Sequence, residues 1–225
     1  MFRKTCLATV VGLGVLAAAG CGEKGHEETA AVTTSPIRPP TSGANIRACS
    51  LNENDIERSV LRKAPAGVFW KRFKGVAVPF SPSAGPMTVQ GEVARCYTHT
   101  PSGALMAAVQ IRVRLERAAG WQKVLRQQVA SDAGKATYAQ TRGSHQVVPA
   151  AEAAQIAGFR IVSYTTQNAV IGTVSRDPAR GGHTAMTTTV RWDGDWKLVL
   201  TSQGSAASVL RADDSLSGYV RWGGF

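Results

Sequence analysis

The sequence predicts an α+β domain in which helices pack on one face of a curved antiparallel sheet. Two observations support this fold class. Segments with helical spacing of apolar residues come first, and the later part of the chain holds short runs rich in Val, Ile, Thr and aromatic residues. Because helices and strands are segregated and do not alternate, an antiparallel sheet is favoured over a parallel one.

Length and composition fit one globular domain behind a leader. The chain has 225 residues, of which 44% are hydrophobic and 18% charged. Its formal net charge of +11 favours anionic partners in general. The basic residues form no run of five or six, however, so we expect no specific nucleic-acid binding.

The first 21 residues have the pattern of a lipoprotein signal peptide. Arg3 and Lys4 form a basic start, residues 7–19 are almost wholly apolar, and the small residues Ala19 and Gly20 precede Cys21. The apolar run is shorter than the roughly 20 residues that a spanning helix needs. We therefore expect cleavage before Cys21, a lipid on its thiol, and an anchor at the extracytoplasmic face of the cell membrane. Ordinary signal cleavage with an unmodified Cys21 is the alternative.

Residues 22–50 are predicted to be a disordered stalk, and residues 51–225 a single domain. The stalk is rich in Thr, Ser, Gly, Pro and Glu and has almost no hydrophobic periodicity. A flexible coil of this length would reach roughly 25–30 Å. Two further cysteines, Cys49 and Cys96, would lie where disulfides form, and the sequence leaves a bridge and two separate thiols equally open.

The first part of the domain gives mixed signals. Asn54 and Glu57 have the spacing of a capping box, which predicts a short helix near residues 54–62. Extended segments are expected at residues 68–70, 75–78 and 87–97, with an irregular loop at residues 82–86 between the last two.

The dipeptide Thr100-Pro101 is a strong helix start, because a hydroxyl cap precedes the residue favoured at the first helical position. Ala104, Ala108, Ile111 and Leu115 then recur at helical spacing, although the period-two alternation of residues 109–115 leaves a strand open. Gly120 should end this helix. Two further helical segments are expected at residues 121–130 and 133–140.

Four strands are expected in the last part of the domain, at residues 159–165, 169–175, 184–192 and 196–200. The turn at residues 193–195 lies between Trp192 and Trp196 and indicates a hairpin. The side chains expected to point into the core are Val170, Val174, Val190, Leu198 and Leu200.

No catalytic or metal-binding motif is recognisable, so we expect neither an enzyme nor a cofactor. His26, His145 and His183 have no partner at metal-ligand spacing. His99, just before the helix start, could line a pocket or carry a proton, but a bond to local backbone is the more ordinary role. Glu116 is expected on a helix surface, and Asp193 and Asp195 are expected to serve the turn.

Several segments resemble an uncharacterised family of exported or membrane-anchored proteins from high-GC Gram-positive bacteria. The most distinctive is His99-Thr100-Pro101-Ser102-Gly103-Ala104-Leu105, and the others are residues 67–70, 75–81, 84–86, 192–200 and 216–224. Cys96 departs from the family's pattern, in which a glycine is expected. The resemblance implies a nuclear-transport-factor-2-like (NTF2-like), cystatin-like cone of the kind found in the outer parts of conjugative transfer machines.

Three functions follow as hypotheses. The first is a lipid-anchored, non-enzymatic scaffold that binds protein partners at the cell surface, as a component of a conjugative transfer apparatus. The second is a lipoprotein that binds a small ligand or cell-wall fragment in the cone cavity, with His99 among the polar groups. The third is a hydrolase or isomerase of the same superfold, for which no catalytic dyad can be located.

Overall fold

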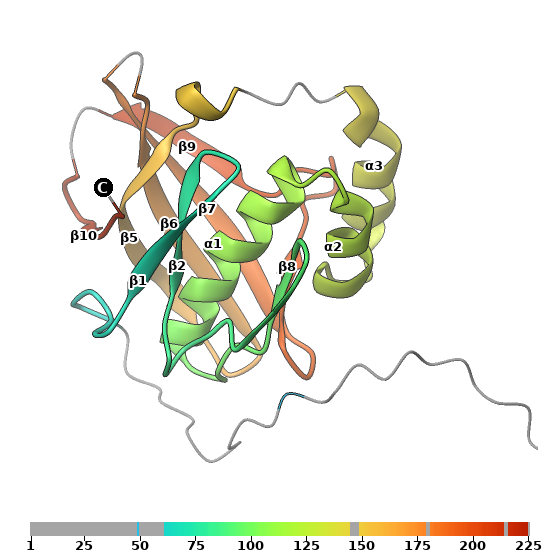
Figure 1. The fold of residues 1–225 in the computed structure, drawn as a ribbon, viewed down its shortest axis with the longest axis horizontal. Coiled ribbons are helices and arrows are strands. Elements are labelled where there is room, and N and C mark those ends of the chain that lie inside the picture. Colours follow the sequence, from blue (N-terminus) through green and yellow to red (C-terminus); the bar gives the residue numbers. More distant parts are fainter. Residues whose placement is uncertain (1–48, 50–60, 145–148, 179–180, 214–215, 225) are drawn as a thin grey trace, which may run out of the picture. The chain divides into compact units, whose positions relative to one another are not determined.

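The computed structural model describes Cys49 and residues 61–144, 149–178, 181–213 and 216–224 (Figure 1). All of them belong to a compact unit that comprises residues 47–225. The signal peptide, most of the stalk and nearly all of the helix expected near residues 54–62 lie outside these residues. Within the described part of the chain, no helix is both long and apolar enough to cross a membrane.

Two small hairpins come first. Strand β1 (Phe69–Phe73) pairs with β2 (Val76–Phe80), and β3 (Thr88–Gln90) pairs with β4 (Val93–Arg95), both antiparallel. The turn of the first hairpin uses Lys74 and Gly75 at φ 47° and 89°, the left-handed geometry that matches strand twist in a two-residue loop. The extended segments expected at residues 68–70 and 75–78 are confirmed, whereas residues 87–97 form a hairpin of two strands and not one extended segment.

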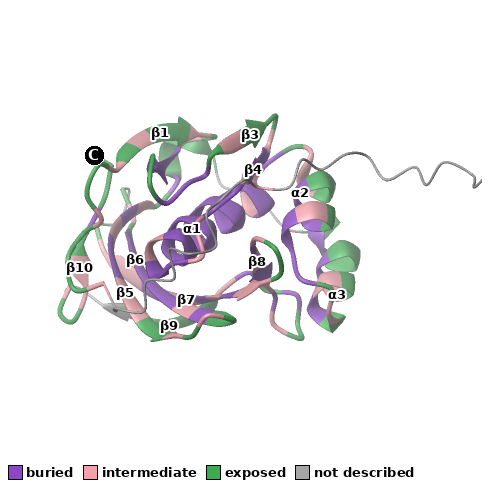
Figure 2. Cartoon of the chain, turned by 90° about the horizontal axis from the view of Figure 1, so that it is seen from below, coloured by how far each residue is buried: buried purple, intermediate pink, exposed green. Residues whose placement is uncertain are grey.

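Helix α1 (Pro101–Arg117) begins where the sequence predicts, which excludes the strand alternative for residues 109–115. The Thr100 hydroxyl caps it by accepting a hydrogen bond from the N–H of Gly103 at 3.1 Å. Fourteen of its 17 residues are buried, so it is covered on nearly all sides and not along one stripe. Figure 2 shows the reason, because α1 lies between the two hairpins and the main sheet.

The glycine in the segment of residues 99–105, at the start of α1, is needed for a steric reason. A methyl group on Gly103 would overlap the carbonyl oxygen of Thr98, so the chain can turn into α1 this tightly only with glycine there. Helices α2 (Trp121–Gln128) and α3 (Ala133–Thr141) follow, with Asp132 capping α3, and two short 3₁₀ turns span Arg142–Ser144 and Ala150–Glu152.

The main sheet is antiparallel, with the order β10-β5-β6-β7-β8. Strand β7 also pairs with β9, which lies along its first half while β8 lies along its second half. Two register shifts in β5 interrupt its ladder with β6, as bulges that bend a sheet do. The strands are β5 (Gln155–Tyr164), β6 (Asn168–Arg176), β7 (His183–Trp192), β8 (Trp196–Val199), β9 (Ser208–Asp213) and β10 (Val220–Arg221).

The core lies between α1 and the main sheet. Val190, Leu198 and Leu200 belong to it as expected. In β6 the prediction was wrong for Val170, whereas Val174 is buried as expected. Ala169 and Ile171 face the core, whereas Val170 is half-buried and Val174 is buried outside the core cluster. Side chains alternate along a strand, and the pairing of Ala169 with Val190 decides which set faces inward.

Candidate ligand-binding site

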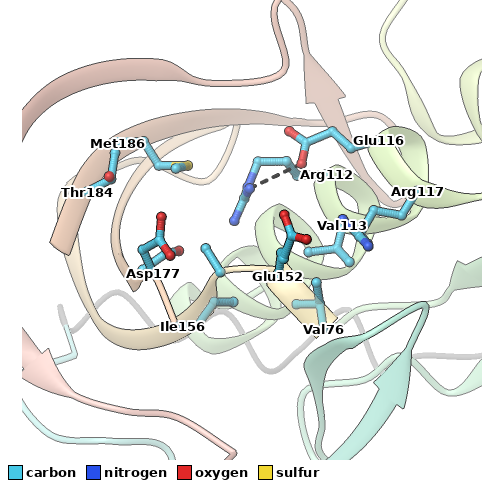
Figure 3. A pocket seen from close by; sticks show the side chains of 12 residues that line it. Val76, Arg112, Val113, Glu116, Arg117, Glu152, Ile156, Asp177, Thr184 and Met186 are labelled. Carbon is cyan, nitrogen blue, oxygen red and sulfur yellow. Dashed lines mark hydrogen bonds and ion pairs between the residues drawn. The ribbon is translucent and has the colours of Figure 1, made fainter. Parts of the chain in front are cut away.

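A cavity of about 450 Å³ opens beside the C-terminal half of α1, facing the ends of β5, β6 and β7 (Figure 3). This volume is within the ~300–1,000 Å³ of typical small-molecule sites. Its wall combines apolar side chains with five charged ones. The lining residues are Val76, Arg112, Val113, Glu116, Arg117, Glu152, Ala154, Ile156, Ser175, Asp177, Thr184 and Met186.

Arg112 lies at the centre of the cavity, where its guanidinium points between Asp177 and Glu152 (Figure 3). Its side chain is only 8% exposed. Its Nη1 forms an ion pair with the Glu116 carboxylate at 3.4 Å, and its buried Nε has no hydrogen-bond partner. A guanidinium carries five N–H donors, and burying an ion is costly unless they are satisfied. Arg112 therefore retains unused capacity for an anionic acceptor.

The sheet adds hydroxyl groups to the same face. Ser175 and Thr184 line the cavity and oppose each other across β6 and β7. Thr173 opposes Met186 two pairs further along the ladder, and Thr188 follows two residues after Met186, so both threonines lie on this face of the sheet. The hydroxyls of Thr173 and Thr188 are buried and have no hydrogen-bond partner. Such groups are uncommon in folded proteins.

The charges of the cavity are mixed. Arg112 and Arg117 are opposed by Glu116, Glu152 and Asp177, a net charge of −1 with two cations against three anions. Glu152 is exposed, whereas Asp177 is half-buried. The apolar part of the wall comes from Val76, Val113, Ile156 and Met186. The arrangement suits a ligand that carries charges of both signs and an apolar portion.

His99 lies away from this cavity, near the start of α1. Its ring stacks on Trp192 with the centroids 3.9 Å apart and meets the edge of Trp196. Nε2–H donates to the carbonyl oxygen of Thr166. The expectation that His99 would be among the polar groups of a pocket does not hold for this cavity, since both its ring face and its Nε2 are used in packing.

Of the predicted site cysteines, Cys21 lies outside the described residues. Cys49 and Cys96 form a disulfide, with their Cα atoms 5.2 Å apart. Within the part of the chain that the structure describes, no group of three or more His, Cys, Asp and Glu side chains could hold a metal ion.

The sequence did not indicate the residues of the cavity. Arg112 is one of three arginines within six residues and looks like part of a solvated helix face. In the structure Arg112 and Arg114 are both buried, because the hairpins cover the side of α1 that an isolated helix would expose. Glu116 is not a simple surface residue either, since it pairs with Arg112. The uninterrupted burial pattern of α1 is the signal that singles out its arginines, and only the fold supplies it.

Fold and cavity together define a mixed α/β protein with mostly antiparallel sheets, three α-helices in the described part of the chain and a charged, ligand-sized cavity. The chain belongs to the family described as a domain of unknown function, DUF8175, whose sequence model matches residues 29–221. The chain matches no curated protein and no solved structure.

Proposed function

We propose that this protein is a non-enzymatic binding lipoprotein that holds a small ligand in the cavity beside α1. The observation that carries the proposal is Arg112, a buried cation with an unpartnered Nε in a cavity of ligand size. A protein under no functional constraint gains little from such a group, because a well-packed apolar side chain of similar volume is often equally stabilising.

The proposal also includes the cellular location of the protein. The basic start, the apolar run and Cys21 support export and acylation, with the domain held at the extracytoplasmic face of the membrane. Mass spectrometry of the native protein should find two O-linked acyl chains on a glyceryl group at Cys21. Recovery of a full-length, unmodified chain from the cytosol would refute this location.

The fold proposed is an NTF2-like, cystatin-like cone. Its support is the long helix α1 lying on one face of a sheet that is bent by two bulges in β5. In this arrangement the cavity would be the open end of the cone. Since one superfold hosts many functions, the binding role rests on the side chains of the cavity and not on the fold.

The test is to fill the cavity and look for the loss of a native ligand. Protein purified from its own membranes is analysed by native mass spectrometry, as wild type and as Met186→Trp. The control is Val209→Trp, which adds the same side chain at a position that is 68% exposed. We expect a bound mass in the wild type and the control that Met186→Trp lacks. If no bound mass is found, or if all three proteins carry it equally, the cavity is not the binding site.

The scaffold function remains a second candidate, as a component of a conjugative transfer apparatus with protein partners at the cell surface. Strand β9 favours it, because Val209 and the 48%-exposed Leu210 are both large and apolar on a strand that, among the described strands, pairs with β7 alone. An exposed strand edge can accept a strand from another chain. Cross-linking in native membranes should capture a protein through β9, and Val209→Lys should abolish that capture. Equal capture by wild type and variant would exclude β9 as the contact.

A further inference from the structure

We propose that the ligand of the cavity is a zwitterionic short peptide or amino acid, held by its carboxylate on Arg112 and by its ammonium group at Glu152 and Asp177. This inference rests on the proposed function and assigns a chemical class to the ligand.

Arg112 is the residue that indicates a carboxylate group on the ligand. The planar guanidinium matches a carboxylate in a bidentate pair, which a single contact to Glu116 at 3.4 Å does not provide. The Arg112 side chain is only 8% exposed, and charge-assisted hydrogen bonds are stronger where a group is withdrawn from water. The hydroxyl groups of Ser175 and Thr184 lie on the wall of the same cavity and can donate to a second anionic oxygen.

The balance of charges among the residues that line the cavity indicates an ammonium group on the ligand. Three carboxylates against two guanidinium groups would repel a phosphate or another dianion, because adding it to a cavity of net charge −1 brings like charges together. A zwitterion adds no net charge and can satisfy both signs. Glu152 and Asp177 come from separate segments, one before β5 and one after β6, and both turn toward Arg112 (Figure 3).

The body of the ligand follows from the apolar wall. Ile156 and Met186 lie on the sheet side, and Val113 and Val76 lie on the side of α1 and the first hairpin. Methionine is flexible and polarisable, so this wall can adapt to side chains of different shape. Charged groups of both signs beside an apolar wall match an amino acid or a short peptide with apolar side chains.

The experiment compares three tripeptide libraries that differ only at their ends. The first has free termini, the second a C-terminal amide, and the third an acetylated N-terminus, all built from uncharged amino acids. Each is added to the full chain, stripped of bound small molecules, and complexes are counted by native mass spectrometry. Arg112→Gln tests the carboxylate contact, and Glu152→Gln with Asp177→Asn tests the ammonium contact. The matched control is Arg176→Gln, an exposed arginine next to Ser175.

We expect the amide library to bind at least tenfold less than the free library, and the acetylated library to bind less as well. Arg112→Gln should remove the preference for a free carboxylate, while Arg176→Gln should keep it. The comparison of libraries on the wild type needs no variant, so it holds even if Arg112→Gln fails to fold.

Two results would overturn the inference. Equal binding of the free and amide libraries would mean that Arg112 does not bind the C-terminal carboxylate. Binding of no library, while native protein carries a mass that Met186→Trp lacks, would mean a ligand of another class, and the proposed function would stand. Binding of no library, together with native protein that carries no bound mass or the same bound mass as Met186→Trp, would refute the two together.

Discussion

The carboxylate of Asp195 accepts a hydrogen bond from the backbone N–H of Tyr97 at 3.0 Å, across 98 residues of sequence. The same carboxylate accepts from the N–H of Cys96 at 2.9 Å and from that of Trp196 at 2.9 Å. Cys96 has a φ of 67°, unusual for a residue other than glycine. Burial raises the pKa of Asp195, although these three backbone donors oppose the shift. Asp195 therefore fixes the segment before α1 to the β7–β8 hairpin.

Replacing Asp195 with Asn should lower the free energy of unfolding by about 1–3 kcal/mol. An amide offers one acceptor oxygen and turns an NH₂ group toward N–H donors that then lose their partner. Urea denaturation measures the change, and Asp193→Asn on the exposed side of the same turn is the control. Equal stability of the two variants would contradict the bridging role.

Removing the disulfide between Cys49 and Cys96 should lower the stability of the domain by roughly 4 kcal/mol in the chain-entropy model, because the bridge closes a loop over a separation of 47 residues. The measurement is urea denaturation of the wild type and of the Cys49→Ser, Cys96→Ser double variant. Reductant should destabilise the wild type and leave the double variant unchanged. A wild type insensitive to reductant would argue that the two thiols are not bridged in the native protein.

Replacing Gly103 with Ala should destabilise the protein by about 1–3 kcal/mol, the usual cost of overpacking. Helix propensity by itself favours alanine over glycine by ~1 kcal/mol. A loss of stability in Gly103→Ala would therefore come from the clash of the added methyl group with the Thr98 carbonyl. Gly143→Ala is the control, since a methyl group there meets nothing within 4 Å. A Gly103→Ala protein with a raised melting temperature would show that the approach of the two segments is not tight.

Alkaline pH should destabilise the protein through Tyr138. Burial raises its pKa from the ordinary 10.0 to about 12, and its hydroxyl donates to the carbonyl oxygen of Leu115 at 2.9 Å. The unfolded chain then loses the phenolic proton above pH 10 while the folded chain keeps it, so the free energy of unfolding falls as pH rises from 10 toward 12. The full loss is on the order of 2 kcal/mol. Urea denaturation between pH 8 and 11.5 should give a steeper decline for the wild type than for Tyr138→Phe, and equal slopes would refute this assignment.

Replacing Arg112 with Met should leave stability unchanged or raise it by about 1–2 kcal/mol. The arginine is buried with one ion pair, and its partner Glu116 is 42% exposed and can return to water. Gln110→Met on the same helix should be destabilising, because Gln110 donates to the Pro79 carbonyl at 2.7 Å and accepts from Arg114 at 2.9 Å, all in buried surroundings. Chemical denaturation compares the two variants. A large loss of stability in Arg112→Met would mean that the arginine serves the fold and not a ligand.

Local chemistry made most of the secondary structure predictable. Thr100-Pro101 specifies the start of α1 because a hydroxyl cap and a fixed φ act within one turn, whatever surrounds them. The turn at residues 193–195 and the strands on either side of it could likewise be predicted from residue types. The face of β6 was not readable, because nearly every residue of that strand is apolar or small and the inward set depends on its pairing with β7.

By itself, the sequence determined the mixed α/β class, the helix start and the segments that form strands, since each depends on neighbours within a few residues. Only the tertiary structure decided that α1 is covered on nearly all sides, that Arg112 is buried in a cavity, and that Asp195 holds Cys96 and Tyr97. These features arise when segments far apart in the chain pack together, because burial and pairing depend on what lies opposite a side chain and not on what precedes it.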